Sequence, residues 1–243
     1  VELLVSGSAA ADDYTLGTTI VIPAGTLSNV GSLIAVDDAT DEIDEEVIAR
    51  LGNITNGDQA TDSEVKIKII DDDVEPSVTI SAAASEIGEG TGTTTTTLTA
   101  ALTLASGKEI TVSLKKTGAA IDGTDYNLPS EIIIPIGAKS ATIALNAIDD
   151  KLDEVNEDVI IEIVSVTNAI KAGLQTKTVM IADDELPPAV TLSVGAFELN
   201  EDADSASTST AAVVTVSIPT VSSKDITVTL SKAGTANALD YTL

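Results

Sequence analysis

The chain has no histidine, no cysteine and no tryptophan, and aromatic residues make up only 2% of its 243 residues. The absence of histidine and cysteine removes the commonest general base, the thiol nucleophile and the usual transition-metal ligands. It also excludes a disulfide framework. Paired carboxylates could run glycoside hydrolysis, but the sequence offers no aromatic-rich cleft to hold a sugar. We therefore expect a protein that is not an enzyme.

Basic residues are also scarce, because 12 lysines and arginines stand against 39 acidic residues and the net charge is −27. A chain of this charge is repelled by nucleic acid and by anionic membrane surfaces, which excludes both as direct partners. Hydrophobic residues make up 43% of the sequence and the mean hydropathy is +0.27. This is enough apolar surface to offset the ordering entropy, so the chain is expected to fold.

The acidic residues recur in one order at one spacing of 112 positions, as from position 13 to position 125. The corresponding groups are Asp13 and Asp125, Asp37-Asp38 and Asp149-Asp150, Glu42 and Glu154, and Asp71-Asp72-Asp73 and Asp183-Asp184-Glu185. A hydrophobic core can hold a repeat together without any acid. Acids kept in register therefore indicate a site that gathers them, most simply around a hard cation such as Ca²⁺.

Short segments rich in β-branched residues alternate with glycine-containing turns, and no segment shows a helical period. In the one complete copy of the repeat, seven segments are candidate strands: 78–80, 93–104, 110–114, 132–136, 141–148, 159–166 and 177–181. Several of them alternate with a period of two, which is typical of half-buried strands. The predicted fold class is all-β, with tandem immunoglobulin-like seven-stranded antiparallel β-sandwiches.

Proline-containing linkers at 74–76 and 186–188 divide the chain into three predicted modules. The first module (1–74) is the C-terminal part of a sandwich, the middle module (75–186) is complete, and the last module (187–243) is an N-terminal part. Two interpretations of the partial modules stay open. The chain is a window of a longer array, or the partial modules of successive copies complete one another in a head-to-tail fibre.

Five short motifs follow one another along the middle module. They are Gly123-Thr124-Asp125-Tyr126, Ile134-Pro135-Ile136-Gly137, Ile148-Asp149-Asp150, the pair Glu154 and Glu157, and Asp183-Asp184-Glu185. In this order, and repeated, they resemble the Calx-beta domain. That family includes regulatory domains of sodium/calcium exchangers and tandem arrays in large bacterial surface proteins.

The resemblance implies a Ca²⁺ cluster at one tip of each sandwich. The first site would use Asp13, Asp37, Asp38, Glu42, Asp71, Asp72 and Asp73, with Glu45 as an extra ligand. The second would use Glu89, Asp125, Asp149, Asp150, Glu154, Asp183 and Asp184, with Glu157 and Glu185 in the places of Glu45 and Asp73. Of the third, only Glu201 and Asp240 lie within the sequence.

The charge argument agrees with the resemblance. Carboxylates brought within a few ångströms of one another repel, and a divalent ion reverses the sign of that interaction. Ca²⁺ accepts six to eight oxygen ligands in loose geometry, which suits side chains from separate loops. The alternative is that the acids cluster at turns only for solubility.

We expect a calcium-binding structural repeat of a secreted adhesin, stalk or filament at the cell surface or in a matrix. Ca²⁺ would rigidify the module junctions, and the partners would be neighbouring modules or copies of the chain. The alternative is a calcium-sensing module that regulates a transporter or signalling protein.

Overall fold

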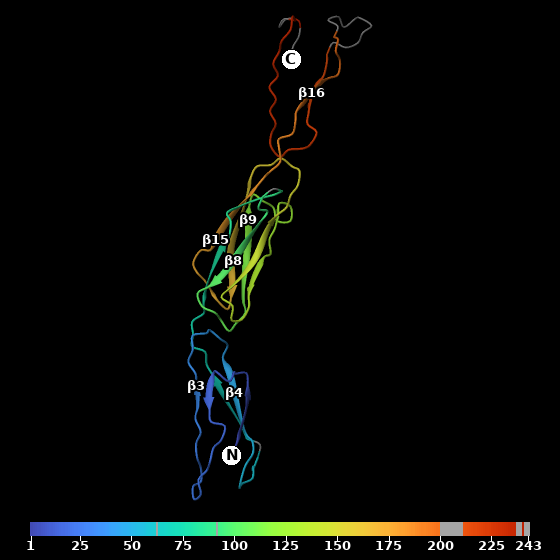
Figure 1. Ribbon diagram of the computed structural model, residues 1–243. Coiled ribbons are helices and arrows are strands. Elements are labelled where there is room, and N and C mark those ends of the chain that lie inside the picture. Colours follow the sequence, from blue (N-terminus) through green and yellow to red (C-terminus); the bar gives the residue numbers. More distant parts are fainter. Residues whose placement is uncertain (62, 91, 200–210, 237–239, 241–243) are drawn as a thin grey trace.

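The computed structural model describes residues 1–61, 63–90, 92–199, 211–236 and 240 (Figure 1). The regular structure of these residues consists of strands alone, which confirms the all-β expectation. Alternating Val, Ile and Thr residues favour strands because branched side chains suit a pleated, half-buried surface. Among the described residues, we find no helix with the length and apolar character needed to cross a membrane.

The first module contains two small antiparallel sheets. Its strands are β1 (Leu3–Gly7), β2 (Tyr14–Leu16), β3 (Leu33–Ala35), β4 (Glu45–Leu51) and β5 (Glu64–Ile69). One sheet has the order β1-β4-β5, and the other is the pair β2-β3.

The middle module is a sandwich of two five-stranded sheets. Its strands are β6 (Ser77–Ala82), β7 (Glu86–Gly88), β8 (Thr95–Leu102), β9 (Ile110–Gly118), β10 (Tyr126–Asn127), β11 (Glu131–Ile134), β12 (Ser140–Ala147), β13 (Glu157–Thr167), β14 (Ile170–Lys171) and β15 (Thr176–Ala182). The sheet orders are β10-β12-β8-β6-β14 and β11-β9-β13-β15-β7.

The seven predicted strands correspond to β6, β8, β9, β11, β12, β13 and β15. Strands β7, β10 and β14 are additions of two or three residues each. β7 and β14 pair in parallel with β15 and β6, at the edges of otherwise antiparallel sheets. Strands this short carry too few residues to show a period in the sequence.

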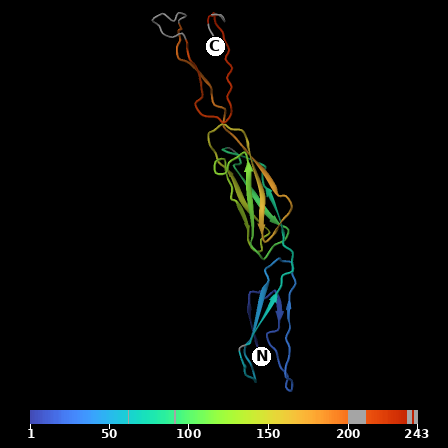
Figure 2. The same cartoon turned by 180° about the vertical axis from the view of Figure 1, so that it is seen from behind.

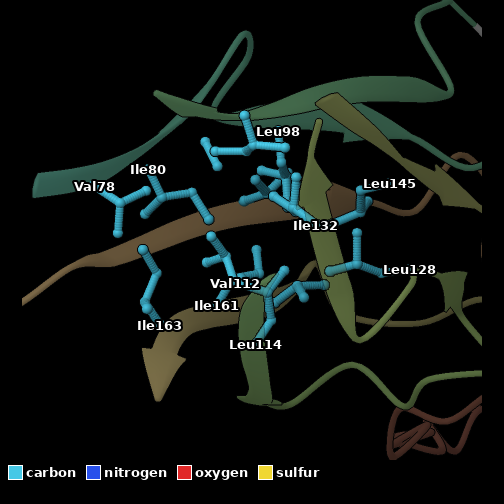
Figure 3. Packing of buried hydrophobic residues seen from close by; sticks show 14 of the residues in the cluster. Val78, Ile80, Leu98, Val112, Leu114, Leu128, Ile132, Leu145, Ile161 and Ile163 are labelled. Carbon is cyan, nitrogen blue, oxygen red and sulfur yellow. The ribbon is translucent and has the colours of Figure 1, made fainter. Parts of the chain in front are cut away.

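The core lies between the two sheets of the middle module, where alternate side chains of both sheets meet (Figure 3). Leu98 on one sheet and Val112 and Ile161 on the other are fully buried. Tyr126 is also buried, as a side chain that holds its loop against the core. The alternation of buried and exposed positions along β8 and β9 is the period of two expected of a half-buried strand.

The last module contains one antiparallel pair in its described part, β16 (Thr191–Val194) and β17 (Val214–Ser217). The three modules follow one another along a single long axis (Figures 1 and 2). Apolar side chains of this pair remain exposed, and Leu192 is 63% exposed. The structure contains one chain, so the head-to-tail association of copies stays a prediction.

Strand pairings of the first module recur in the middle module at the spacing of the acids. Tyr14 pairs with Ala35 in β2-β3, and Tyr126 pairs with Ala147 in β10-β12. In the same way Glu45 lies opposite Ile69 in β4-β5, as Glu157 lies opposite Ile181 in β13-β15. The strands next to the acidic residues therefore have the same register in both modules.

The position of the core gives a stability prediction. Replacing Leu98 by alanine is expected to lower the free energy of unfolding by about 2–5 kcal/mol, because a buried leucine is lost and a cavity remains. Leu174 is 78% exposed, so Leu174→Ala is the matched control and should change stability by less than about 0.5 kcal/mol. Urea unfolding followed by circular dichroism measures both. If the two substitutions lowered the free energy of unfolding equally, the described position of the core would be wrong.

Candidate metal centre

The ends of several strands bring the acids of the middle module to one tip of the sandwich. β7 and the end of β15 run in parallel, so Glu89 and Asp183, which follow them directly, leave the sheet at the same edge. Glu157 begins β13 opposite the end of β15. Asp125 precedes β10, which pairs with the end of β12, and Asp149 lies just beyond that end.

Two groups of three carboxylates meet at this tip. Oxygen atoms of Glu89, Asp150 and Glu185 lie within 4.8 Å of one another, and so do oxygen atoms of Asp149, Asp184 and Glu185. Glu185 belongs to both groups. Its Oε2 is buried and has no hydrogen-bond partner within the described part of the chain. A buried carboxylate oxygen without a partner is costly, which makes this atom a candidate ligand for a cation.

A glycine permits the close packing of these acids. A Cβ atom at Gly90 would lie 2.3 Å from Oδ1 of Asp149 and 3.1 Å from Oδ1 of Asp184. Any other residue would therefore require the carboxylate of Asp149 to shift. Gly90 acts here by leaving room for the acids to converge.

The electrostatics of the tip are those of crowded like charges. Burial, followed by repulsion from Asp150 and Asp183, raises the pKa of Glu89 to about 7. Burial and repulsion from neighbouring aspartates also raise the pKa of Glu154, Glu157 and Glu185. Several of these carboxylates thus resist ionisation unless a positive charge is supplied.

The first module has an equivalent cluster. A hollow of about 60 Å³ is lined by all eight acidic residues expected there, namely Asp13, Asp37, Asp38, Glu42, Glu45, Asp71, Asp72 and Asp73. Oxygen atoms of Asp13, Glu42 and Glu45 lie within 4.8 Å of one another. The pKa values of Glu42 and Glu45 are raised, first by burial and then by Asp13.

The structure thus brings together the residues expected at the first two sites. In the middle module, Asp183 Oδ1 accepts a 2.9 Å hydrogen bond from the backbone N–H of Glu154, and Asp125 contributes to the raised pKa of Glu154. The third site is different. Glu201 lies outside the described residues, and Asp240 is exposed. That these residues are metal ligands stays a prediction.

The donor set fits a hard cation. Every candidate ligand is a carboxylate, and backbone carbonyls and water are the other oxygens within reach of loops at a surface. Oxygen-only ligand sets suit Mg²⁺, Ca²⁺ and Mn²⁺. When bound, such an ion would supply the positive charge that the cluster lacks.

The sequence analysis missed four residues at these tips: Asp41, Asp153, Lys108 and Lys224. The ammonium group of Lys108 lies 3.9 Å from Asp71, and that of Lys224 lies 3.5 Å from Asp183. A signal was present. Asp41 and Asp153 are 112 positions apart, as the other acids are, and the two lysines are 116 apart, as Gly118 and Gly234 are.

No family model and no curated protein matches the sequence. Among solved structures, CBD12 from CALX1.2 is similar at 20% identity, with 45% of this chain and 46% of that chain covered and a TM-score of 0.38. The apo-form Calx CBD1 domain is 21% identical, with 44% and 98% covered and a TM-score of 0.37. A two-domain protein of unknown function from Bacteroides fragilis is 10% identical, with 49% and 55% covered and a TM-score of 0.34. The match spans less than half of the CBD12 chain and almost all of the CBD1 domain.

The raised pKa of Glu89 predicts that the stability of the metal-free protein, measured in chelator, depends on pH. Its pKa is about 7 when folded against an ordinary 4.5, so the folded state holds the proton more tightly. The resulting stabilisation is complete below pH 4.5 and is lost as the pH rises to 7. It amounts to no more than about 3 kcal/mol.

Thermal melting of the metal-free protein at pH 5 and pH 7.5 measures this effect. In Glu89→Gln, the difference in melting temperature between the two pH values should be smaller by the part that Glu89 contributes, because glutamine does not titrate. Glu131→Gln, at an exposed position on β11, should behave as the wild type. If Glu89→Gln shows the same melting-temperature difference as the wild type, the raised pKa of Glu89 is not the cause of the pH dependence.

Proposed function

We propose that the acidic tips of the first and middle modules bind Ca²⁺ and that the protein is a structural repeat of a cell-surface stalk, adhesin or filament. The observation that carries the metal proposal is the geometry of Glu185. Its side chain is shared by two groups of converging carboxylates, and one of its oxygens is buried without a partner. A cation at this tip would satisfy that oxygen and relieve the repulsion around it.

Calcium is the ion that this geometry favours among hard cations. The acids of the two groups come from three different segments and include a pair of adjacent residues, Asp149 and Asp150, which join different groups. Mg²⁺ demands a near-ideal octahedron and keeps several waters, whereas Ca²⁺ accepts six to eight oxygens at irregular angles. Two groups that share Glu185 also leave room for more than one ion.

The position of the acids along the chain of modules supports a mechanical role. Asp71, Asp72 and Asp73 immediately precede the linker 74–76, and Asp183 and Asp184 precede the linker 186–188. A metal bound there joins the loops of a tip to the segment that leads into the next module. Binding would restrict hinging between modules, and depletion would weaken that restriction. The partners in this role are neighbouring modules of the same array, in a secreted protein.

Calcium is therefore expected to raise the melting temperature of the protein. At a concentration about one hundred times the dissociation constant, binding adds about 2.7 kcal/mol of stability per site. Combining Asp149→Asn with Asp150→Asn removes two carboxylates from the middle tip, so the shift contributed by that tip should disappear. Differential scanning calorimetry in chelator and in CaCl₂ measures the effect.

The matched control combines Glu131→Gln with Glu162→Gln, which changes the net charge by the same amount. Glu131 lies on β11 and Glu162 on β13, within strands rather than at the tip. This variant should keep the full calcium shift. If CaCl₂ does not change the melting of the wild type, the metal proposal is wrong.

A further inference from the structure

The junction between the first and middle modules is closed by a buried aspartate. Asp41 belongs to the first module and is only 2% exposed. Its Oδ1 accepts a 2.7 Å bond from Nζ of Lys108, and its Oδ2 accepts a 3.0 Å bond from Oγ of Ser106. Both donors belong to the middle module. The backbone completes the contact, since the carbonyl of Asp41 accepts a 2.9 Å bond from the N–H of Gly107.

The junction between the middle and last modules repeats this arrangement. Asp153 is 4% exposed. Its Oδ1 accepts a 2.6 Å bond from Lys224, and its Oδ2 accepts a 2.7 Å bond from Ser222. The backbone N–H of Ser223 donates to the carbonyl of Asp153 at 3.0 Å, as Gly107 does at the first junction. In both cases the aspartate and the serine form an isolated parallel β-bridge.

These contacts differ from ordinary surface ion pairs. The side chains of Asp41 and Asp153 are 3% and 4% exposed, whereas Glu64 on the surface of the first module is 34% exposed. Lys108 is 18% exposed and Lys224 is 37% exposed. A buried carboxylate needs its hydrogen bonds satisfied, and losing one partner of a buried pair leaves an uncompensated charge. Within the part of the chain that the structure describes, every side-chain partner of the aspartate comes from the following module.

We propose that the Ser-x-Lys loop (106–108 and 222–224) is a docking surface, and that the partner it fits is the tip aspartate of the module before it. The one complete module has the aspartate Asp153 at its tip and, at its other end, the loop with Ser106 and Lys108. The contact therefore joins modules in one direction only. It holds them together without a metal ion.

The lysine gives this joint a second property. Its ammonium group also lies near the acidic cluster, 3.9 Å from Asp71 at the first junction and 3.5 Å from Asp183 at the second. Each following module thus supplies a tethered positive charge to the tip that precedes it. The joint is favoured by the same excess of negative charge that favours a bound cation.

The joint can be tested in the full chain by distance measurements between spin labels. The protein has no cysteine, so two introduced cysteines are labelled uniquely. Thr15→Cys and Ala144→Cys, at exposed strand positions, report the first junction. Ala144→Cys and Thr215→Cys report the second. In chelator, each pair should give a narrow distance distribution in the otherwise wild-type chain.

The test variants are Lys108→Met and Lys224→Met, which remove the ammonium group and keep an unbranched side chain. Lys108→Met should lose the narrow distribution at the first junction and keep it at the second, and Lys224→Met should do the reverse. The control is Lys139→Met, because Lys139 is exposed and forms no salt bridge within the described residues. It should leave both distributions narrow.

The outcomes separate the joint from the metal proposal. A distribution that is broad in chelator and narrows only with CaCl₂ would overturn the joint and leave calcium binding standing. Lysine variants as narrow as Lys139→Met would also overturn it. A narrow distribution in chelator that Lys108→Met broadens supports the joint, even if calorimetry detects no calcium shift.

Discussion

Repulsion among carboxylates at the module tips is the constraint on which the rest of the structure depends. The strand order delivers acids from several loops to one edge, and the fold cannot move them apart without changing the register of β13 and β15. Burial, followed by repulsion from neighbouring aspartates, raises the pKa of Glu89 at this edge. The repulsion is relieved when a carboxylate takes up a proton, or when positive charge comes from a mobile ion or from another part of the chain.

The two sources of positive charge would act at different places. Lys108 and Lys224 reach the side of each tip that faces the next module, where they contact Asp71 and Asp183. Glu185, which has one buried oxygen, forms a group with Asp149 and Asp184, for which no contact with lysine is seen among the described residues. In the proposed joint, the tethered ammonium group would hold the following module in one orientation. A bound metal would then act on the acids that the lysine does not reach.

Much of this arrangement could be predicted from the sequence, because two of its determinants, the alternation within strands and the repeated spacing of the acids, are visible in the sequence itself. Alternation predicted the seven long strands, and acids in register predicted that Asp13 and Asp125 would meet other acids. The joint was missed because its meaning depends on a contact across modules. Asp41 looks like one more acid before Glu42, and only its burial distinguishes it. Burial of a polar residue is set by packing against a partner about 65 residues away, and alternation within a strand does not report it.

The Ser-x-Lys loops of the two junctions share a plan but differ at their middle residue, which is Gly107 in one and Ser223 in the other. At Gly107 a Cβ atom would lie 2.7 Å from Cγ of Glu42, so a side chain there would require the Glu42 side chain to move. The second junction has Ser223 at this place, and its hydroxyl donates a 3.3 Å bond to the carbonyl of Asp153. At the first junction, Glu42 packs against the joint. At the second junction, the hydroxyl of the loop serine adds a hydrogen bond instead. The aspartate, the serine and the lysine are the constant part of the joint, and the residue between serine and lysine is the part that differs.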